Sequence, residues 1–338
     1  MRPARARRLI ASSALIAMCS LTAAITTGCS SDETHPAPPW ATTTLGRPSN
    51  TSTPILSDAA FPAALAVTPD GGVIYGERST GRIIRLAADL TPPGIVVATV
   101  VVSEIGDSQR GLLGLAVDPD DGTRVFASWT RSGDSRIVVA QVTPGPQRII
   151  WEGPPSAEVA NAGRLVWRGA ALVLSIGDLN RGQPAAGSPP GAATDWRGTI
   201  ISLDPDGPAD QTPTVLSSGW NNPYALALGP EGDLWLADNI GGGCCERLAH
   251  LPATGEPVIT RLGDDQHEIV PAAIVPLGPE RFGVCSYLTH QMLDIQVIDG
   301  RLSAPSAPVF DGCSIAAVRL DDHRVVMATE STLSIGVL

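Results

Sequence analysis

The stretch Gly219–Leu248 reads GWNNPYALALGPEGDLWLADNIGGGCCERL, and it decides the fold. It holds a short apolar run, Tyr224–Leu228, then the turn Gly229-Pro230-Glu231-Gly232, and then a second run, Asp233–Ala237. Two short apolar runs joined by a Pro/Gly turn predict two antiparallel strands. A glycine-rich loop with two adjacent cysteines follows, and we expect any chemistry of this segment to lie in that loop.

The same strand–turn–strand unit recurs along the chain. The turns TPDGG (68–72) and DPDDG (118–122) also lie between apolar runs, and the units repeat about every 45–50 residues, the length of a propeller blade. About six units fit into residues 53–338, so the sequence predicts an all-β fold, a six-bladed β-propeller of four-stranded antiparallel blades. A β-sandwich is the competing all-β fold, and the repeat length argues against it. We expect Thr53–Leu56 to add the outermost strand of the last blade and close the ring.

The first 52 residues predict export rather than a further domain. A basic segment, MRPARARR, precedes an apolar run, Leu9–Ile25, and then the residues Thr26-Thr27-Gly28-Cys29. This order is typical of an export signal, and a small residue before Cys29 resembles a bacterial lipobox, although Thr26 stands where that box usually has Leu. We therefore expect a lipoprotein signal peptide (1–28), a Ser/Thr/Pro-rich tether (29–52) and one domain (53–338). The expected location is the outer face of the cell membrane, with Cys29 lipidated; the alternative is plain secretion.

Composition excludes several kinds of partner and chemistry. The 338 residues carry a formal net charge of −11 and include no lysine, which excludes Schiff-base chemistry. Loss of the four arginines of the signal would make the chain still more acidic, so nucleic acid is not an expected partner. We expect a monomer that meets the membrane through its lipid anchor only.

The four cysteines beyond the signal and Cys29 are candidates for disulfides, because exported chains usually oxidise an even set of cysteines. They are Cys244, Cys245, Cys285 and Cys313. We favour bridges from Cys244 and Cys245 to Cys285 and Cys313, which would staple neighbouring blades. The alternative is a vicinal bond between Cys244 and Cys245 at the channel mouth.

Several motifs together resemble one family. They are ERSTGRI (77–83), GLLGLA (111–116) followed by Asp118-Pro119, GRL (163–165) with IGD (176–178), and GWNNP (219–223). In this combination the chain resembles the soluble quinoprotein glucose/sorbosone dehydrogenases, the PQQ-dependent sugar dehydrogenase family. The resemblance implies a six-bladed propeller that holds PQQ and calcium at the mouth of its channel. It also implies two-electron oxidation of a sugar or related alcohol, in which a histidine takes the hydroxyl proton.

The resemblance assigns roles to particular residues. It implies substrate contacts by Gln109 and Gln183, contacts to the cofactor by Asp178, Asn221 and Asn222, and metal ligation by the carbonyls of Ile240 and Gly241 with Glu246. Trp220, beside Asn221, is the tryptophan best placed to stack on a sugar ring.

The chain departs from the family where the chemistry is done. Ala160 occupies the position of the catalytic histidine, and the nearest polar residue, Asn161, cannot accept a proton at neutral pH. Asn221 replaces an arginine that contacts the quinone, and the quinone-binding lysine has no counterpart. PQQ carries three carboxylates, so two cations are lost from its site. In the calcium loop, Cys244 and Cys245 replace two aspartates, and thiols are poor calcium ligands.

Three hypotheses follow. The first is an exported oxidoreductase that acts on a sugar or related alcohol with PQQ and calcium. The second is a catalytically degenerate propeller that binds a glycan or a protein at the cell envelope. The third is a metal-dependent lactonase-type hydrolase, for which Glu246, Asn221 and Asn222 would form the metal site.

Overall fold

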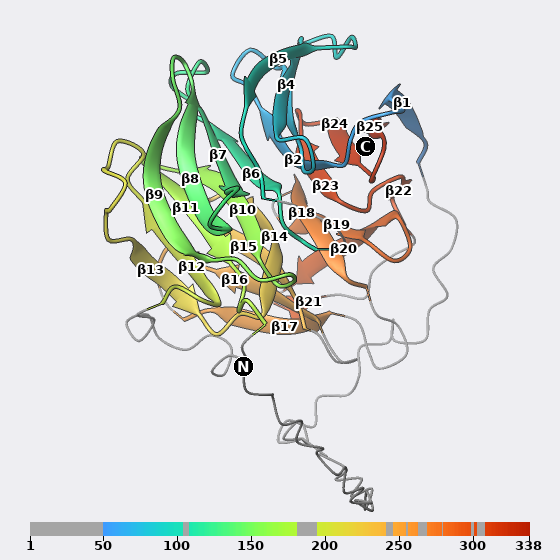
Figure 1. The fold of residues 1–338 in the computed structure, drawn as a ribbon. Helices are drawn as coiled ribbons and strands as arrows, with labels where there is room; N and C mark the ends of the chain where they lie inside the picture. Colours follow the sequence, from blue (N-terminus) through green and yellow to red (C-terminus); the bar gives the residue numbers. More distant parts are fainter. Residues whose placement is uncertain are drawn as a thin grey trace, which may run out of the picture. The chain divides into compact units, whose positions relative to one another are not determined.

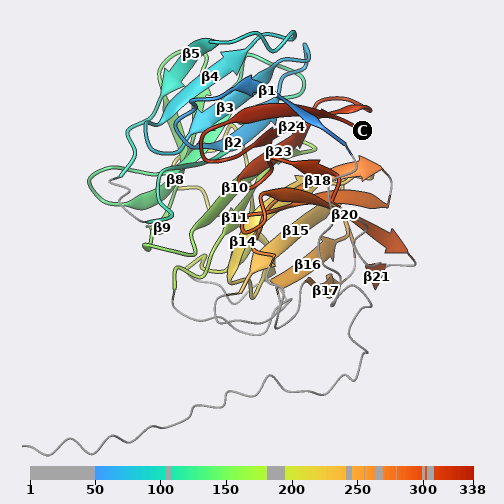
Figure 2. The same cartoon turned by 90° about the vertical axis from the view of Figure 1, so that its right-hand side faces the viewer.

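Six antiparallel sheets follow one another along the chain in the computed structural model (Figures 1 and 2). Their innermost strands line a central channel. The structure describes residues 50–103, 108–180, 195–240, 246–254, 256–262, 269–278, 280–298, 301–302 and 308–338. All of these residues lie in one unit, residues 37–338. The prediction of a six-bladed β-propeller is confirmed. No helix in the described ranges is long and apolar enough to cross a membrane.

The strands of each blade run in chain order from the channel outward. Blades 1 to 3 comprise β2 (Pro62–Val67), β3 (Val73–Glu77), β4 (Arg82–Leu86) and β5 (Ile95–Thr99); β6 (Leu112–Val117), β7 (Val125–Thr130), β8 (Arg136–Thr143) and β9 (Arg148–Pro155); and β10 (Ala162–Arg168), β11 (Ala171–Ile176), β12 (Thr199–Leu203) and β13 (Thr214–Ser218).

Blades 4 to 6 comprise β14 (Asn222–Leu228), β15 (Leu234–Asn239), β16 (Glu246–Leu251) and β17 (Val258–Leu262); β18 (Pro271–Gly278), β19 (Arg281–Ser286), β20 (Gln291–Ile298) and β21 (Arg301–Leu302), with β22 (Phe310–Asp311) also paired to β20; and β23 (Ala316–Arg319), β24 (Arg324–Ala328), β25 (Leu333–Val337) and β1 (Ser52–Leu56). β14 begins two residues earlier than predicted, because Asn222 pairs with Asn239 beyond a bulge.

The first described strand closes the ring. Ser52 lies opposite Gly336 and Thr53 opposite Ile335, so β1 is the outermost strand of the blade that otherwise holds the last three strands of the chain. This confirms the prediction for residues 53–56. Strands β6 and β7 are buried along their whole length, whereas the outer strand β5 is largely exposed. The inner strands are buried on both faces because neighbouring blades pack against each other, which accounts for their continuous apolar sequence.

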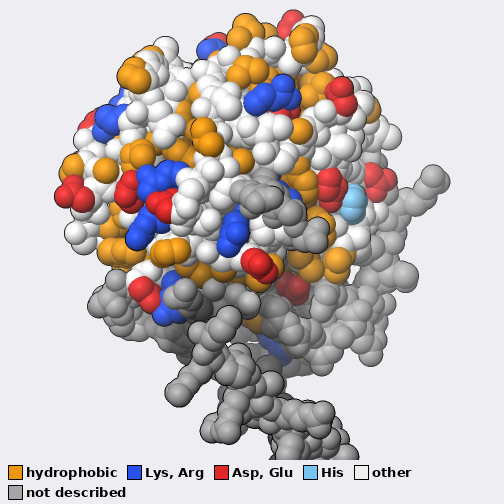
Figure 3. Space-filling model, in the orientation of Figure 1, with side chains coloured by type: hydrophobic (Ala, Val, Ile, Leu, Met, Phe, Trp, Pro, Cys, Tyr) orange, Lys and Arg blue, Asp and Glu red, His pale blue; other side chains and the backbone are white. Residues whose placement is uncertain are grey.

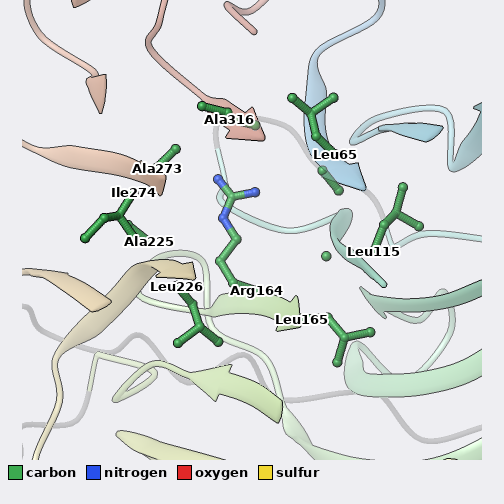
Figure 4. Close-up of a pocket in the computed structure, with 12 residues that line it drawn as sticks. Leu65, Leu115, Arg164, Leu165, Ala225, Leu226, Ala273, Ile274 and Ala316 are labelled. Atoms are coloured by element: carbon green, nitrogen blue, oxygen red, sulfur yellow. The ribbon is translucent and has the colours of Figure 1, made fainter. Parts of the chain in front are cut away.

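Arg164 fills the channel with its guanidinium group (Figure 4). Nε donates to the carbonyl of Tyr224 at 2.7 Å, and the two terminal nitrogens donate to four further carbonyls. Those four belong to Ala63, Leu113 (3.2 Å), Ala272 (2.9 Å) and Ile315 (2.6 Å). Each carbonyl comes from the innermost strand of a different blade or from the residue just before it. The five N–H donors of one side chain therefore contact all five other blades.

These carbonyls are available because the innermost strands bulge at the same place. The pairing of β2 with β3 shifts between Pro62 and Ala64, and that of β6 with β7 shifts between Leu112 and Gly114. Similar register shifts occur in β14 around Tyr224 and in β18 around Ala272. A bulged residue leaves the ladder of the sheet, so its carbonyl needs another donor.

Burial lowers the pKa of Arg164 below its ordinary value, since a charged group loses its hydration in the channel. Arginine side chains stay protonated in proteins, so the buried guanidinium carries its charge. No carboxylate forms an ion pair with it in the described part of the chain. Carbonyl dipoles and the ring of Tyr224, 4.1 Å from the guanidinium carbon, compensate the charge instead.

One disulfide joins consecutive blades. Cys285 in β19 is bonded to Cys313, which lies between β22 and β23, with 5.2 Å between the Cα atoms, and both residues are fully buried. This bond staples blade 5 to the connection that enters blade 6. The expected pairing of these two cysteines with Cys244 and Cys245 is therefore wrong. Cys244 and Cys245 lie outside the described residues, as does Cys29.

The motif ERSTGRI (77–83) is a locked turn. The buried carboxylate of Glu77 accepts hydrogen bonds from Thr80 Oγ1 at 2.5 Å and from Arg82 Nε at 2.7 Å. Burial acts to raise the pKa of Glu77, but these hydrogen bonds outweigh it and hold the pKa below its ordinary value. Gly81 takes a φ of 68°, and a side chain there would collide with the carbonyl of Val100. This family motif therefore has a structural role.

Charged side chains are mixed on the surface. On the face in Figure 3, basic and acidic side chains lie next to each other among scattered hydrophobic ones. Many described arginines are paired, such as Arg131 with Asp134 at 2.5 Å and Arg124 with Asp118 at 2.9 Å. The visible part of this face therefore has no continuous basic surface of the kind that binds nucleic acid.

We predict that Arg164→Lys lowers the free energy of unfolding by roughly 2–6 kcal/mol, because an ammonium has three donors and leaves at least two buried carbonyls unsatisfied at about 1–3 kcal/mol each. Urea unfolding followed by circular dichroism measures the change. Arg85→Lys, at a half-buried arginine paired with the exposed Asp70, is the control and should leave the midpoint unchanged. Equal stability of Arg164→Lys and the wild type would show that the ring does not depend on the guanidinium.

Candidate functional site

The predicted site residues lie at one end of the propeller, around the channel. β6, β10 and β14 begin at this end, and the antiparallel strands β11 and β15 end there. The loops at this end, which we call the mouth, carry the following described candidates: Gln109, Asn161, Asp178, Trp220, Asn221, Asn222, Ile240 and Glu246. Gln183 and Gly241 lie outside the described residues.

Gln109 connects three blades across the mouth. Its Oε1 accepts a hydrogen bond from the backbone N–H of Ala160 at 2.8 Å and one from Nδ2 of Asn222 at 3.3 Å. Asn222 is buried, and its Oδ1 accepts the N–H of Ala162 at 3.0 Å. The structure thus brings Gln109 and Asn222 together as the resemblance implies, but both amides form internal bonds between loops.

Asp178 and Asn221 form a second contact between blades. The N–H of Asp178 donates to the carbonyl of Asn221 at 2.6 Å, and Nδ2 of Asn221 donates to Oδ2 of Asp178 at 2.8 Å. The other carboxylate oxygen of Asp178 accepts the N–H of Asn180 at 2.7 Å, and the side chain is buried. At the position of the family's quinone-contacting arginine, the chain therefore has an amide that is bonded to a carboxylate.

A buried ion pair that sequence reasoning missed supports these loops. Asp238, at the end of β15, is fully buried and forms a salt bridge with Arg247 of β16. Its Oδ1 also accepts the N–H of Asn222 at 2.6 Å and that of Asn221 at 3.1 Å. Burial raises the pKa of the Asp238 carboxyl, while Arg247 and the two backbone amides favour its ionised form. The only sequence signal is an Asp directly after an apolar strand.

The position of the family's catalytic base has no proton acceptor. Ala160 takes a left-handed conformation with φ 57°, and Ala162, two residues later, has φ 53°. Asn161, the polar residue between them, is fully buried. Its Oδ1 accepts the N–H of Ala157 and its Nδ2 donates to the carbonyl of the same residue, both at 2.9 Å. Asn161 therefore closes its own loop and is not available to a ligand.

Trp220 does not line the mouth. Its ring is fully buried, its Nε1 lies 3.2 Å from Ser217 Oγ, and the guanidinium carbon of Arg247 lies 5.3 Å from the ring centre. The expectation that Trp220 stacks on a sugar is therefore wrong in this structure, because the ring is part of the core between blades 3 and 4.

The predicted calcium site stays a prediction, because Gly241 lies outside the described residues. The buried Glu246 accepts the N–H of Val270 at 3.2 Å, which joins blade 4 to the entry of blade 5. No described group of three or more His, Cys, Asp or Glu residues could hold a metal ion. The amides of Asn221 and Asn222 bond to Asp178 and Gln109, respectively. These contacts do not favour the metal site that a lactonase-type hydrolase needs.

The residues at the assigned quinone positions do not fit a tricarboxylate cofactor. Asn221 and Asn222 are neutral, and Asp178 would place a negative charge beside the carboxylates of the quinone. Arg247, whose guanidinium also donates to the carbonyl of Gly219, is engaged by Asp238. The described mouth therefore keeps the hydrogen-bonded framework implied by the resemblance without the cations at these positions.

Comparisons with known proteins agree with this architecture. A model of the glucose/sorbosone dehydrogenase family matches residues 59–242, more than half of the chain. Quinoprotein glucose dehydrogenase B of Acinetobacter calcoaceticus is 28% identical over 223 residues, which are 53% of this chain and 46% of that protein. The chain thus spans about half the length of this relative.

Solved structures show the same fold. The PQQ-bound aldose sugar dehydrogenase of Streptomyces coelicolor matches with a TM-score of 0.69 and 18% identity, over 84% of this chain and 96% of that one. A putative gluconolactonase matches with a TM-score of 0.54 and 14% identity, over 87% of this chain and 93% of that one. At such identities the likeness concerns the fold alone.

We predict that Asp238→Asn destabilises the protein by about 3–5 kcal/mol, because it leaves Arg247 without its buried partner, and that it speeds hydrogen exchange at the amides of Asn221 and Asn222. Urea unfolding and exchange by mass spectrometry measure the two effects. Asp294→Asn is the matched control, since Asp294 pairs with Arg281 in blade 5. It should lower stability without selective exchange at the mouth. Protected amides in Asp238→Asn would contradict the role of this carboxylate.

Proposed function

The chain belongs to the glucose/sorbosone dehydrogenase family, and from this premise we propose that its propeller mouth binds a sugar or glycan without oxidising it. The observation that carries the proposal is Ala160 at the position of the catalytic histidine, with its N–H held by Gln109. Oxidation at a sugar hydroxyl needs a group that accepts the proton, and a positioned base contributes about 10²–10⁴-fold to such a step.

Polar groups at the mouth suit a neutral carbohydrate. Gln109 and Asn221 are partly exposed, and amides both donate to and accept from hydroxyl groups. The loops that carry them are bonded to one another through Asn222 and Asp238, so the surface is held in place before a ligand arrives. The glycan is expected to contact these amides rather than a tryptophan face, because Trp220 is buried.

PQQ- and calcium-dependent sugar oxidation is the second candidate function. Its support is the family itself, together with Asp178 and Gln109, which match the family's positions and lie in one network through Asn221 and Asn222. If the quinone bound here, it would accept the two electrons of the substrate. This chain would then need a proton acceptor other than Ala160.

We predict that the purified protein with calcium shows no saturable change in the PQQ absorption spectrum and reduces no dye with any sugar of a panel. Isothermal titration and a glycan array should instead detect sugar binding that Gln109→Ala weakens. The double variant Ala160→His/Asn221→Arg restores a base and a cation. It therefore tests whether their loss is the reason that the wild type does not oxidise sugars. Quinone binding with sugar-dependent dye reduction by the wild type would establish the second candidate, and failure to bind any sugar would overturn the first.

We also propose that the protein is exported and held at the outer face of the cell membrane by a lipid on Cys29. The support is the order of the N-terminal sequence: four arginines, an apolar run and a small residue before a cysteine. Sugar binding at a cell envelope would suit such a location.

We predict that the wild type incorporates radiolabelled palmitate and sediments with membranes, and that Cys29→Ser does neither. Cys19→Ser, a cysteine inside the apolar run, is the control and should retain the label. An unlabelled wild type in the culture medium would instead support plain secretion.

A further inference from the structure

A cavity of about 210 Å³ opens between blades 4 and 5, at the end of the blades opposite to the mouth. The turn between β14 and β15 forms one side, and β16 and β17 form its wall in blade 4. Blade 5 contributes Glu280 and Val297. None of the mouth residues lines this cavity, so it is a separate site.

A stack of three rings makes one wall rigid. Trp235 lies between His250, at 4.4 Å and 10° to its plane, and Phe282, at 4.3 Å. Asp233 fixes the first two rings, because its Oδ2 accepts Trp235 Nε1 at 2.7 Å and lies 2.6 Å from His250 Nε2. Trp235 and His250 both line the cavity, so it has an aromatic surface of defined orientation.

The charge of the cavity is negative. Glu231, Asp233 and Glu280 line it, and no arginine does. Neither Glu231 nor Glu280 takes part in an ion pair in the described part of the chain, and Asp233 pairs with His250 alone. Glu231 and Glu280 are exposed and Asp233 is half-buried, so the carboxylates lie where a ligand from solvent can reach the cavity.

We propose that this cavity binds a small organic cation, an ammonium group on a short alkyl chain. The ammonium has three donors for the carboxylates of Glu231, Asp233 and Glu280. Leu248, Val258 and Val297 line the cavity beside them and provide an apolar surface for the alkyl chain. This inference goes beyond the proposed sugar binding and does not depend on it.

Titration with butylammonium tests the proposal, followed by NMR at the indole N–H of Trp235, which donates to Asp233 in the cavity wall. We expect a saturable shift. The double variant Glu231→Gln/Glu280→Gln should weaken binding at least tenfold, because it removes two charges and keeps the Asp233–His250 contact. The matched control is Glu256→Gln, an exposed glutamate in the same blade that does not line the cavity; it should bind as the wild type does.

1-Butanol separates charge recognition from simple filling of an apolar cavity, because it has the same alkyl chain without the charge. We expect no saturable shift with it. Equal binding of butanol and butylammonium, undiminished binding by the double variant, or the absence of a saturable shift with butylammonium would each overturn the proposal. A shift with glucose in place of butylammonium would overturn it in favour of a carbohydrate site.

Discussion

The guanidinium of Arg164 is the contact on which the ring depends. Five donors of one side chain bond to carbonyls from the five other blades, and four of those carbonyls come from residues at bulges. The bulges lie close to the mouth, since Asn222 directly precedes the bulge of β14 and Ala160 stands four residues before Arg164. Whatever fixes the blades at the channel therefore also fixes the loops that carry the candidate site.

Two kinds of position lie at the mouth: residues that hold the loops together, and positions that in the family carry out the reaction or bind the quinone. Gln109, Asp178 and Asn222 match the family and bond to backbone groups or to one another. Such residues are needed for the loops to keep their shape, whatever the site binds. The positions that would do chemistry or bind the quinone directly, Ala160 and Asn221, differ from the family. A family relationship can therefore be read from the framework while the reaction of the relatives does not follow from it.

Local sequence patterns predicted most of the fold. They could not predict which residues far apart in the sequence contact each other. Pro/Gly turns between apolar runs located the six blades. Residues 53–56 belong to none of these repeat units, so they were predicted to close the ring as the outermost strand of the last blade. The role of Arg164 was not predictable, because its partners lie up to 151 residues away and are backbone carbonyls. The same holds for the bond between Cys285 and Cys313 and for the Asp238–Arg247 pair. The prediction that Trp220 stacks on a sugar was wrong because it rested on the polar residue next to it, Asn221, whereas the ring is buried in the core.

The hairpin of β14 and β15 places carboxylates at both ends of one blade, and their surroundings differ. At the mouth, Asp238 is buried and neutralised by Arg247. At the other end, the carboxylate of Asp233 contacts a ring nitrogen of His250 and lines an open cavity together with Glu231 and Glu280. A buried carboxylate needs a partner, because an uncompensated buried charge is costly, and Asp238 has this partner in Arg247. Glu231 and Glu280 are exposed and hydrated, so the fold bears no such cost there, and a cation that enters the cavity meets both charges.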